Sequence, residues 1–155
     1  MIPGAGRKAL ILGVQTQMCA VPLTCVIETM RPLPTERIAG TPPFVLGVAI
    51  VRGIPTPVVD LGAILGAPPA HKGERFVTVR TGSRQVALLA GTVLGIRDLD
   101  ALAATQELPP LLEGAPEDVI EKIGTLDERF LVVLQEAWKL PDEVWHAVTA
   151  QEVAE

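Results

Sequence analysis

The sequence predicts a mainly β, barrel-like fold. Short apolar runs rich in β-branched residues recur along the 155-residue chain, and 14 glycines and 14 prolines punctuate it. Many short strands with frequent turn residues and little long helix are typical of barrels. Hydrophobic residues make up 48% of the chain but aromatic residues only 3%, so aliphatic side chains must fill the core. A chain of this length buries roughly 68–70% of its unfolded surface, which is enough for one domain to fold alone.

The first elements expected are two short strands and a helix. Residues 9–14 and 17–21 form apolar runs separated by a polar break, which predicts a hairpin. Residues 22–30 are expected to form a helix, because apolar side chains recur at helical spacing. These side chains are Leu23, Val26, Ile27 and Met30.

The centre of the chain predicts a second hairpin. Residues 44–51 form a buried apolar strand, and Arg52-Gly53 makes a tight turn before the next strand;. Pro55 and Pro57 lie two apart on that second strand, so both lack an amide donor on the same side. We therefore expect it at a sheet edge or a barrel seam. Residues 61–66 predict a short helical turn.

Later elements follow the same pattern. Residues 76–80 and 85–90 flank the turn sequence Thr81-Gly82-Ser83-Arg84, residues 92–96 continue as a strand, and residues 119–123 and 130–135 read as the last strands;. Between them, residues 99–112 predict an irregular or loosely helical linker. A terminal helix starts at Pro141 with Asp142 as its candidate cap. Its apolar stripe either packs back on the barrels or is offered to a partner, and consists of Val144, Ala147 and Val148.

Composition argues against several classes of protein. The net charge is −5 and basic residues are scattered singly, which disfavours nucleic-acid binding;. No apolar run approaches the ~20 residues of a membrane-spanning helix. The run after Arg7-Lys8 ends too early for a signal peptide, so a cytoplasmic protein is expected. Cys19 and Cys25 are expected to be buried free thiols.

The residues needed for catalysis are sparse. Ser83 is the only serine and lies in an expected turn, and folding can bring either His71, in a loop, or His146, on the terminal helix, close to it. A serine nucleophile needs a histidine and a carboxylate beside it. No metal-ligand spacing occurs, and the acidic residues near the C-terminal third predict a solvated surface: Glu113, Glu117, Asp118 and Glu121;. We expect neither an enzyme nor a cofactor or metal site.

The segment from Arg37 to Leu61 resembles a known family. Pro42-Pro43-Phe44-Val45-Leu46-Gly47-Val48, Ile50-Val51-Arg52-Gly53 and Pro57-Val58-Val59-Asp60-Leu61 match the central motif of the CheW family of bacterial chemotaxis coupling proteins. The resemblance covers residues 8–140, with residues 141–155 as a terminal helix and tail. It implies two SH3-like five-stranded β-barrel subdomains that share a hydrophobic core.

The resemblance also implies an adaptor that binds the cytoplasmic tip of a methyl-accepting chemoreceptor and the regulatory domain of a CheA-type histidine kinase. Arg52 matches a family arginine at the contact surface, although an arginine that stabilises its own turn, paired with a nearby carboxylate, explains the residue equally well. Glu28, Val26 and Gly47 match positions linked to receptor coupling. From the sequence alone, Glu28 is a polar helix residue, Val26 an apolar packing residue and Gly47 a close backbone crossing.

Two positions depart from the family pattern. Ile50 replaces an asparagine, and Gly91 stands where a carboxylate is expected. These departures leave open a divergent adaptor that binds receptors but not the kinase. A small ligand-binding barrel or enzyme is the alternative from another class, and it requires a concave pocket with convergent polar groups.

Overall fold

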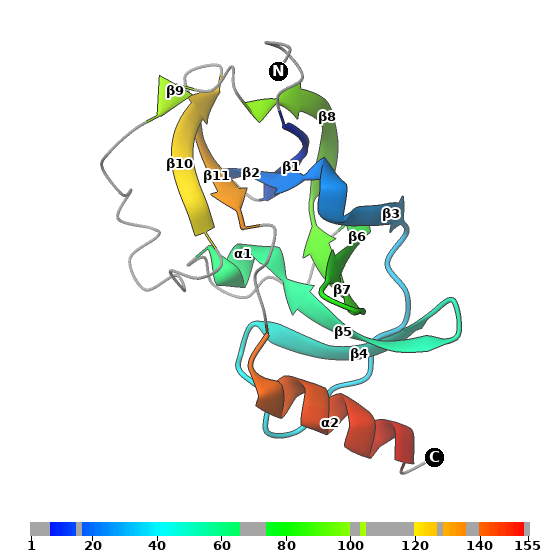
Figure 1. The fold of residues 1–155 in the computed structure, drawn as a ribbon. Coiled ribbons are helices and arrows are strands. Elements are labelled where there is room, and N and C mark those ends of the chain that lie inside the picture. Colours follow the sequence, from blue (N-terminus) through cyan, green and yellow to red (C-terminus); the bar gives the residue numbers. More distant parts are fainter. Residues whose placement is uncertain are drawn as a thin grey trace.

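The computed structural model of the protein describes residues 7–14, 17–65, 74–99, 103–104, 120–126, 129–135 and 140–153. They form two sheets, one above the other in Figure 1. The upper sheet has the strand order β8-β1-β2-β11-β10-β9 and the lower sheet the order β3-β6-β7-β5-β4. We refer to them as the six-stranded lobe and the five-stranded lobe.

The six-stranded lobe is built from both ends of the chain. Its strands are β1 (Lys8–Val14), β2 (Gln17–Pro22), β8 (Thr92–Asp98), β9 (Ala103–Ala104), β10 (Ile120–Leu126) and β11 (Arg129–Leu134). The five-stranded lobe contains β3 (Val26–Met30), β4 (Val45–Val51), β5 (Ile54–Asp60), β6 (Arg75–Thr81) and β7 (Arg84–Ala90). The chain therefore leaves one lobe after β2 and returns to it at β8.

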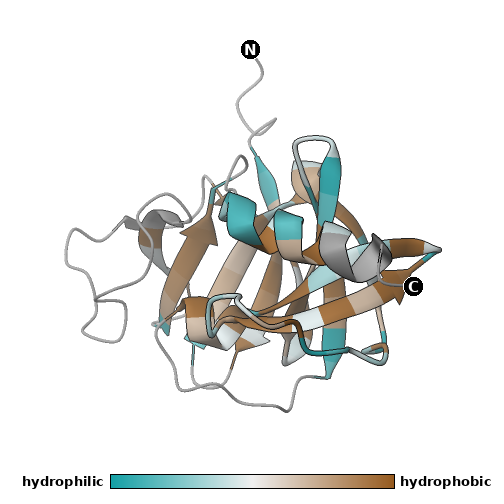
Figure 2. Ribbon diagram, turned by 90° about the horizontal axis from the view of Figure 1, so that it is seen from below, coloured by the Kyte–Doolittle hydropathy of each residue, from teal (hydrophilic) through white to brown (hydrophobic). Residues whose placement is uncertain are grey.

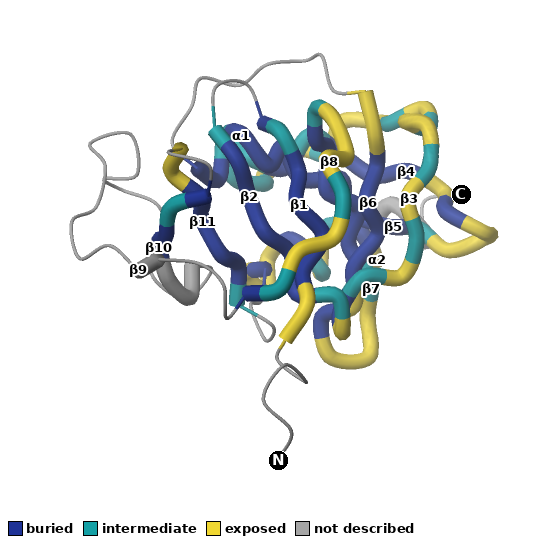
Figure 3. Tube along the Cα trace, turned by 90° about the horizontal axis from the view of Figure 1, so that it is seen from above, coloured by how far each residue is buried: buried dark blue, intermediate teal, exposed yellow. Residues whose placement is uncertain are grey.

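Alternation along the strands places side chains in three clusters. On β7, Ala87 and Leu89 point into the five-stranded lobe, whereas Val86 and Leu88 point into a cluster that both lobes share. On β1, Ala9 and Ile11 likewise point into the six-stranded lobe, and the residues between them point into the shared cluster. Figures 2 and 3 show hydrophobic and buried residues running along the strands. Because both faces are buried, strands read as near-continuous apolar runs.

These observations confirm the predicted fold class, which is mainly β with two small lobes, a shared hydrophobic core and a C-terminal helix. The six-stranded lobe exceeds the expected five strands because the two-residue β9 pairs with β10. Of the predicted linker at residues 99–112, the structure describes only Leu99 and β9. The acidic residues from Glu113 to Asp118 lie outside the described residues.

The helix predicted over residues 22–30 is wrong. Leu23–Cys25 form only one 3₁₀ turn, and β3 follows at once, paired with β6. Helical spacing and strand alternation both fit so short an apolar segment, and the β-branched residues Val26, Ile27 and Thr29 favour the strand. As a result, Glu28 lies on an edge strand rather than on a helix.

The two prolines of β5 do not lie on an edge strand, because β5 lies between β4 and β7. Its ladder to β7 covers only Val58–Asp60, so the half that carries Pro55 and Pro57 pairs on one side alone. Of the two positions expected for this strand, the sheet edge is therefore wrong, whereas a half-strand that pairs on one side alone is compatible with a barrel seam.

The helices are short and well anchored. The Asp60 carboxylate accepts a hydrogen bond from the Gly62 amide at 3.0 Å and caps α1 (Leu61–Ile64);. The terminal helix α2 (Asp142–Val153) packs on β5, beneath the five-stranded lobe in Figure 1. Val144 and Val148 are buried there, which settles that the apolar stripe of the helix packs back on the protein.

Replacing Leu88 with alanine is expected to destabilise both lobes together. Leu88 is fully buried in the shared cluster, and such a truncation costs about 2–5 kcal/mol of unfolding free energy. Leu94→Ala on β8 is the control, because Leu94 is 53% exposed. Urea unfolding followed by circular dichroism should give one transition, shifted only in Leu88→Ala. Two separate transitions would contradict the shared core.

Candidate partner-binding site

Arg52 lies at the tip of the hairpin between β4 and β5. Its φ angle is 50° and that of Gly53 is 80°, so two consecutive residues adopt left-handed conformations. This geometry is typical of the type I′ turn, whose twist matches that of the flanking strands. A non-glycine residue rarely adopts such a φ angle. The turn directs a side chain that is 75% exposed outward from the end of the lobe.

The Arg52 guanidinium binds the Glu28 carboxylate through two hydrogen bonds. Arg52 Nε donates to Glu28 Oε2 at 2.6 Å, and Arg52 Nη2 donates to Glu28 Oε1 at 2.7 Å. Glu28 lies on β3 and Arg52 next to β4, which are the two outer strands of the five-stranded sheet. The ion pair therefore joins the opposite edges of the lobe. The structure thus brings together two residues that the sequence singled out separately.

The pair also shifts the titration of both groups. The hydrogen bond from Arg52 lowers the pKa of Glu28, and the hydrogen bond to Glu28 raises the pKa of Arg52. Because the pKa of Glu28 is depressed in the folded state, its contribution to stability is present above the unfolded-state pKa and disappears as the pH falls through the folded-state pKa. Both side chains contact solvent, which screens the attraction and keeps this contribution small.

Val26 and Gly47 have different surroundings. Val26 is half-buried, pairs with Val79 on β6 and packs against the shared cluster. Gly47 has a φ angle of 150°, and a Cβ added there would collide with the Glu36 carbonyl oxygen. Glu36 and Val48 exchange two backbone hydrogen bonds, of 2.8 and 2.7 Å. Gly47 is therefore required where the chain before β4 crosses close to the strand.

The sequence analysis missed the exposed apolar side chains near the ion pair. Ile50 and Ile54 stand on either side of the Arg52 turn and are 56% and 52% exposed, and Ile27 beside Glu28 is 40% exposed. Strand periodicity over residues 26–30 would have indicated that Ile27 and Val26 face opposite ways. The helical interpretation grouped them on one buried face.

The two departures from the family pattern differ in structure. Ile50 is exposed on the surface beside Arg52, where a change of side chain alters what a partner meets. Gly91 lies against the six-stranded lobe: its amide donates to the Gly13 carbonyl oxygen at 2.9 Å, and an added Cβ would lie 2.6 Å from that oxygen. A carboxylate side chain at this position would force the backbone apart.

Nothing among the described residues suggests catalysis. Ser83 and His146 are both exposed, and His71 lies outside the described residues. Within the described ranges, no group of three His, Cys, Asp or Glu side chains could hold a metal ion. Cys19 and Cys25 are buried and form no disulfide, as predicted, and burial raises the pKa of the Cys19 thiol. In the same part of the chain, no helix is long and apolar enough to cross a membrane.

Comparison with known proteins identifies the family. Residues 8–137 match the model of the CheW-like domain. The chain belongs to the CheW-like domain family. Two relatives are Protein FrzA of Myxococcus xanthus, 38% identical over 61% of this chain and 58% of its own length, and Chemotaxis protein CheW of Klebsiella aerogenes, 28% identical over 83% of this chain and 78% of its own length.

A solved structure confirms the fold. The scaffolding protein TtCheW from Thermoanaerobacter tengcongensis has a TM-score of 0.69 with 18% sequence identity, over 84% of this chain and 89% of that chain. The resemblance drawn from the central motif is thus confirmed at the level of family and fold. The chain matches little more than half the length of FrzA.

Gly47→Ala is expected to destabilise this CheW-like protein more than Gly40→Ala. Both glycines have a positive φ angle, which costs alanine about 1–3 kcal/mol;. Only Gly47 also lacks space for a Cβ, since nothing lies within 4 Å at Gly40. Urea denaturation should show an additional loss of about 1–3 kcal/mol for Gly47→Ala. Equal losses of unfolding free energy in the two variants would mean that the backbone at Glu36 can move away from residue 47 to make room for a Cβ.

Proposed function

We propose that this protein is a non-enzymatic, cytoplasmic adaptor of a bacterial chemosensory system. It couples the cytoplasmic tip of a chemoreceptor to the regulatory domain of a CheA-type histidine kinase, without a cofactor or metal ion. Coupling is geometric, because the adaptor responds through different affinities for different states of its two partners. Membership of the CheW-like family and the names of its relatives support this role.

The observation that carries the proposal is the presentation of Arg52. A guanidinium has five N–H donors, and two of them bind Glu28, so three remain for another group;. Because Glu28 already fixes the plane of the guanidinium, a partner carboxylate or carbonyl loses less conformational entropy on binding. A lysine would offer no comparable planar fork.

The surroundings of Arg52 also suit protein contact. Ile50 and Ile54 give exposed apolar area immediately beside a charge. Interfaces between proteins commonly combine an apolar centre with a polar rim, and arginine is enriched in them. The hairpin tip thus offers both components within a few residues.

A second candidate is the divergent adaptor that binds receptor but not kinase. Gly91 favours it, because the expected carboxylate is absent and the backbone contact with Gly13 leaves no room for one. Receptor and kinase fragments must therefore be tested separately. Binding of both fragments would exclude the divergent form, and binding of the receptor fragment alone would support it.

Arg52→Ala is expected to weaken partner binding by about tenfold or more, as for an interface arginine. Its melting temperature should change by less than about 3 °C, because an exposed ion pair contributes little to stability. Pull-downs with a receptor-tip fragment and a kinase regulatory domain, together with thermal unfolding, measure both effects. Arg129→Ala on β11 is the control for loss of an exposed arginine.

Glu28→Gln separates the two roles of the pair. It leaves the Arg52 guanidinium in place but removes the carboxylate that holds it, so binding should fall less than in Arg52→Ala. A large drop in melting temperature in either variant, with binding retained, would assign the ion pair to the fold alone and overturn the proposal.

A further inference from the structure

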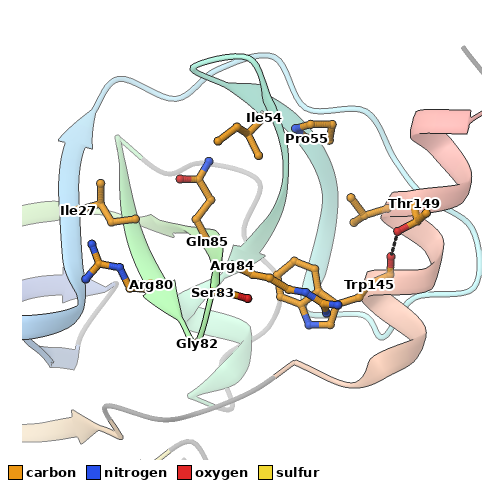
Figure 4. A pocket seen from close by; sticks show the side chains of 11 residues that line it. Ile27, Ile54, Pro55, Arg80, Gly82, Ser83, Arg84, Gln85, Trp145 and Thr149 are labelled. Carbon is orange, nitrogen blue, oxygen red and sulfur yellow. Dashed lines mark hydrogen bonds between the residues drawn. The ribbon is translucent and has the colours of Figure 1, made fainter.

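A cavity of about 410 Å³ opens next to the hairpin that carries Arg52. It lies between β3, the β6–β7 turn, the start of β5 and helix α2, and Figure 4 shows its lining side chains. Ile27 and Arg80 stand on one side of it, Ile54 and Pro55 on a second, and Trp145 on the helix side. A volume of this size lies within the range of ligand pockets, about 300–1,000 Å³.

The prolines of β5 explain why the cavity exists. In a hairpin with a two-residue turn, the residues that flank the turn, here Val51 and Ile54, form a hydrogen-bonded pair, and hydrogen-bonded pairs then alternate with non-hydrogen-bonded pairs along the strands;. Pro55 and Pro57 fall in non-hydrogen-bonded pairs, so their backbone nitrogens point away from β4, towards β7. Neither nitrogen carries a hydrogen, so the parallel ladder stops at Val58. Beyond that point a side-chain bond replaces it: Gln85 Nε2 donates to Thr56 Oγ1 at 2.9 Å.

The cavity has an unbalanced positive charge. Arg80 and Arg84 both line it, and none of the lining residues is acidic. The Arg84 guanidinium lies over the Trp145 ring, 4.6 Å from its centroid, which fixes its position by a cation–π contact;. Two arginines in a lining that contains no carboxylate favour a ligand that brings its own negative charge;.

Beside the arginines, the lining combines the polar side chains of Ser83, Gln85 and Thr149 with apolar side chains that continue onto the surface. Ile27 and Ile54 line the cavity and remain 40% and 52% exposed. A small free acid would cover only the cavity. A polypeptide segment would cover the isoleucines as well, and it could carry a carboxylate beside an apolar side chain.

We propose that this cavity receives an acidic side chain from an extended segment of a partner protein, with the neighbouring apolar side chain of that segment against Ile27 and Ile54. Arg80 and Arg84 bind the carboxylate, and Trp145 forms the wall that holds Arg84 in place. This site shares Ile54 with the surface beside Arg52, but its cations are Arg80 and Arg84 rather than Arg52, so the inference goes beyond the proposed coupling function and does not depend on it.

The test uses an acetylated and amidated heptapeptide, Gly-Glu-Leu-Glu-Leu-Glu-Gly, titrated into the full chain. Side-chain NMR signals of Arg80, Arg84 and the Trp145 indole should shift in a saturable manner. The same peptide with glutamine in place of glutamate should bind about tenfold or more weakly, because the charge-assisted hydrogen bonds are lost. Equal binding of the two peptides would overturn the proposal.

Variants locate the contact. Arg80→Gln removes one cation without disturbing α2 and should weaken the acidic peptide several-fold, whereas Arg129→Gln on β11, with the same loss of charge, should not. Arg52→Ala should also leave peptide binding unchanged, which separates this site from the proposed coupling surface. Unaltered binding by Arg80→Gln would contradict the inference. So would hexanoate binding as tightly as the peptide, since the site would then recognise free acids.

Discussion

The fold depends on one cluster of side chains that belongs to both lobes. The central strands β1, β2, β7 and β11 each contribute alternate residues to their own lobe and to the shared cluster. Both faces of each strand must therefore be apolar, and packing has to be close on both sides. This requirement explains the aliphatic composition and the near absence of aromatic residues. Since the chain crosses between lobes after β2 and after β7, the six-stranded lobe is discontinuous in sequence, and the five-stranded lobe is inserted into it.

The charged side chains of the two proposed sites lie on turns, on an edge strand and at the ends of strands, outside the shared cluster. Arg52 lies on a turn, Glu28 on an edge strand, and Arg84 directly after the β6–β7 turn. At the same end of the five-stranded lobe, Pro55 and Pro57 prevent the ladder between β5 and β7 from extending, and a cavity with two arginines in its lining opens there. The Arg52–Glu28 pair and the cavity both lie at this end of the five-stranded lobe, where the charged side chains are not packed into the shared cluster.

Local patterns predicted most strands and all of the hairpin turns among the described residues, because alternation and glycine placement act over short distances. They failed at residues 22–30, where a five-residue apolar segment fits either periodicity and pairing with β6 decides the outcome. The Arg52–Glu28 pair joins residues 24 positions apart, and only the order of strands in the sheet brings them together. The motif resemblance nevertheless pointed to both residues, since a family motif carries information about contacts that periodicity does not.

The position of Pro55 and Pro57 shows how a correct local inference can miss its consequence. Two missing amide donors on one side of a strand are compatible with an edge, where solvent replaces them. They are equally compatible with an inner strand whose neighbour diverges, provided that another group spans the gap. Gln85 and Thr56 provide that link through their side chains. The divergence, rather than an open edge, is what creates a lined cavity beside the Arg52 turn.

In the proposed adaptor role, the two-lobed body influences its partners through where and how tightly it holds them. Because the shared cluster fixes one lobe against the other, a partner bound at the Arg52 end has a defined orientation relative to a partner bound elsewhere. The ion pair adds local rigidity at the point of contact, since two bonds fix the guanidinium plane. A fixed donor discriminates between partner states that present a carboxylate at slightly different angles, whereas a mobile one would adapt to each. In the proposed adaptor, selectivity between partner states therefore rests on the same bonds that close the five-stranded lobe.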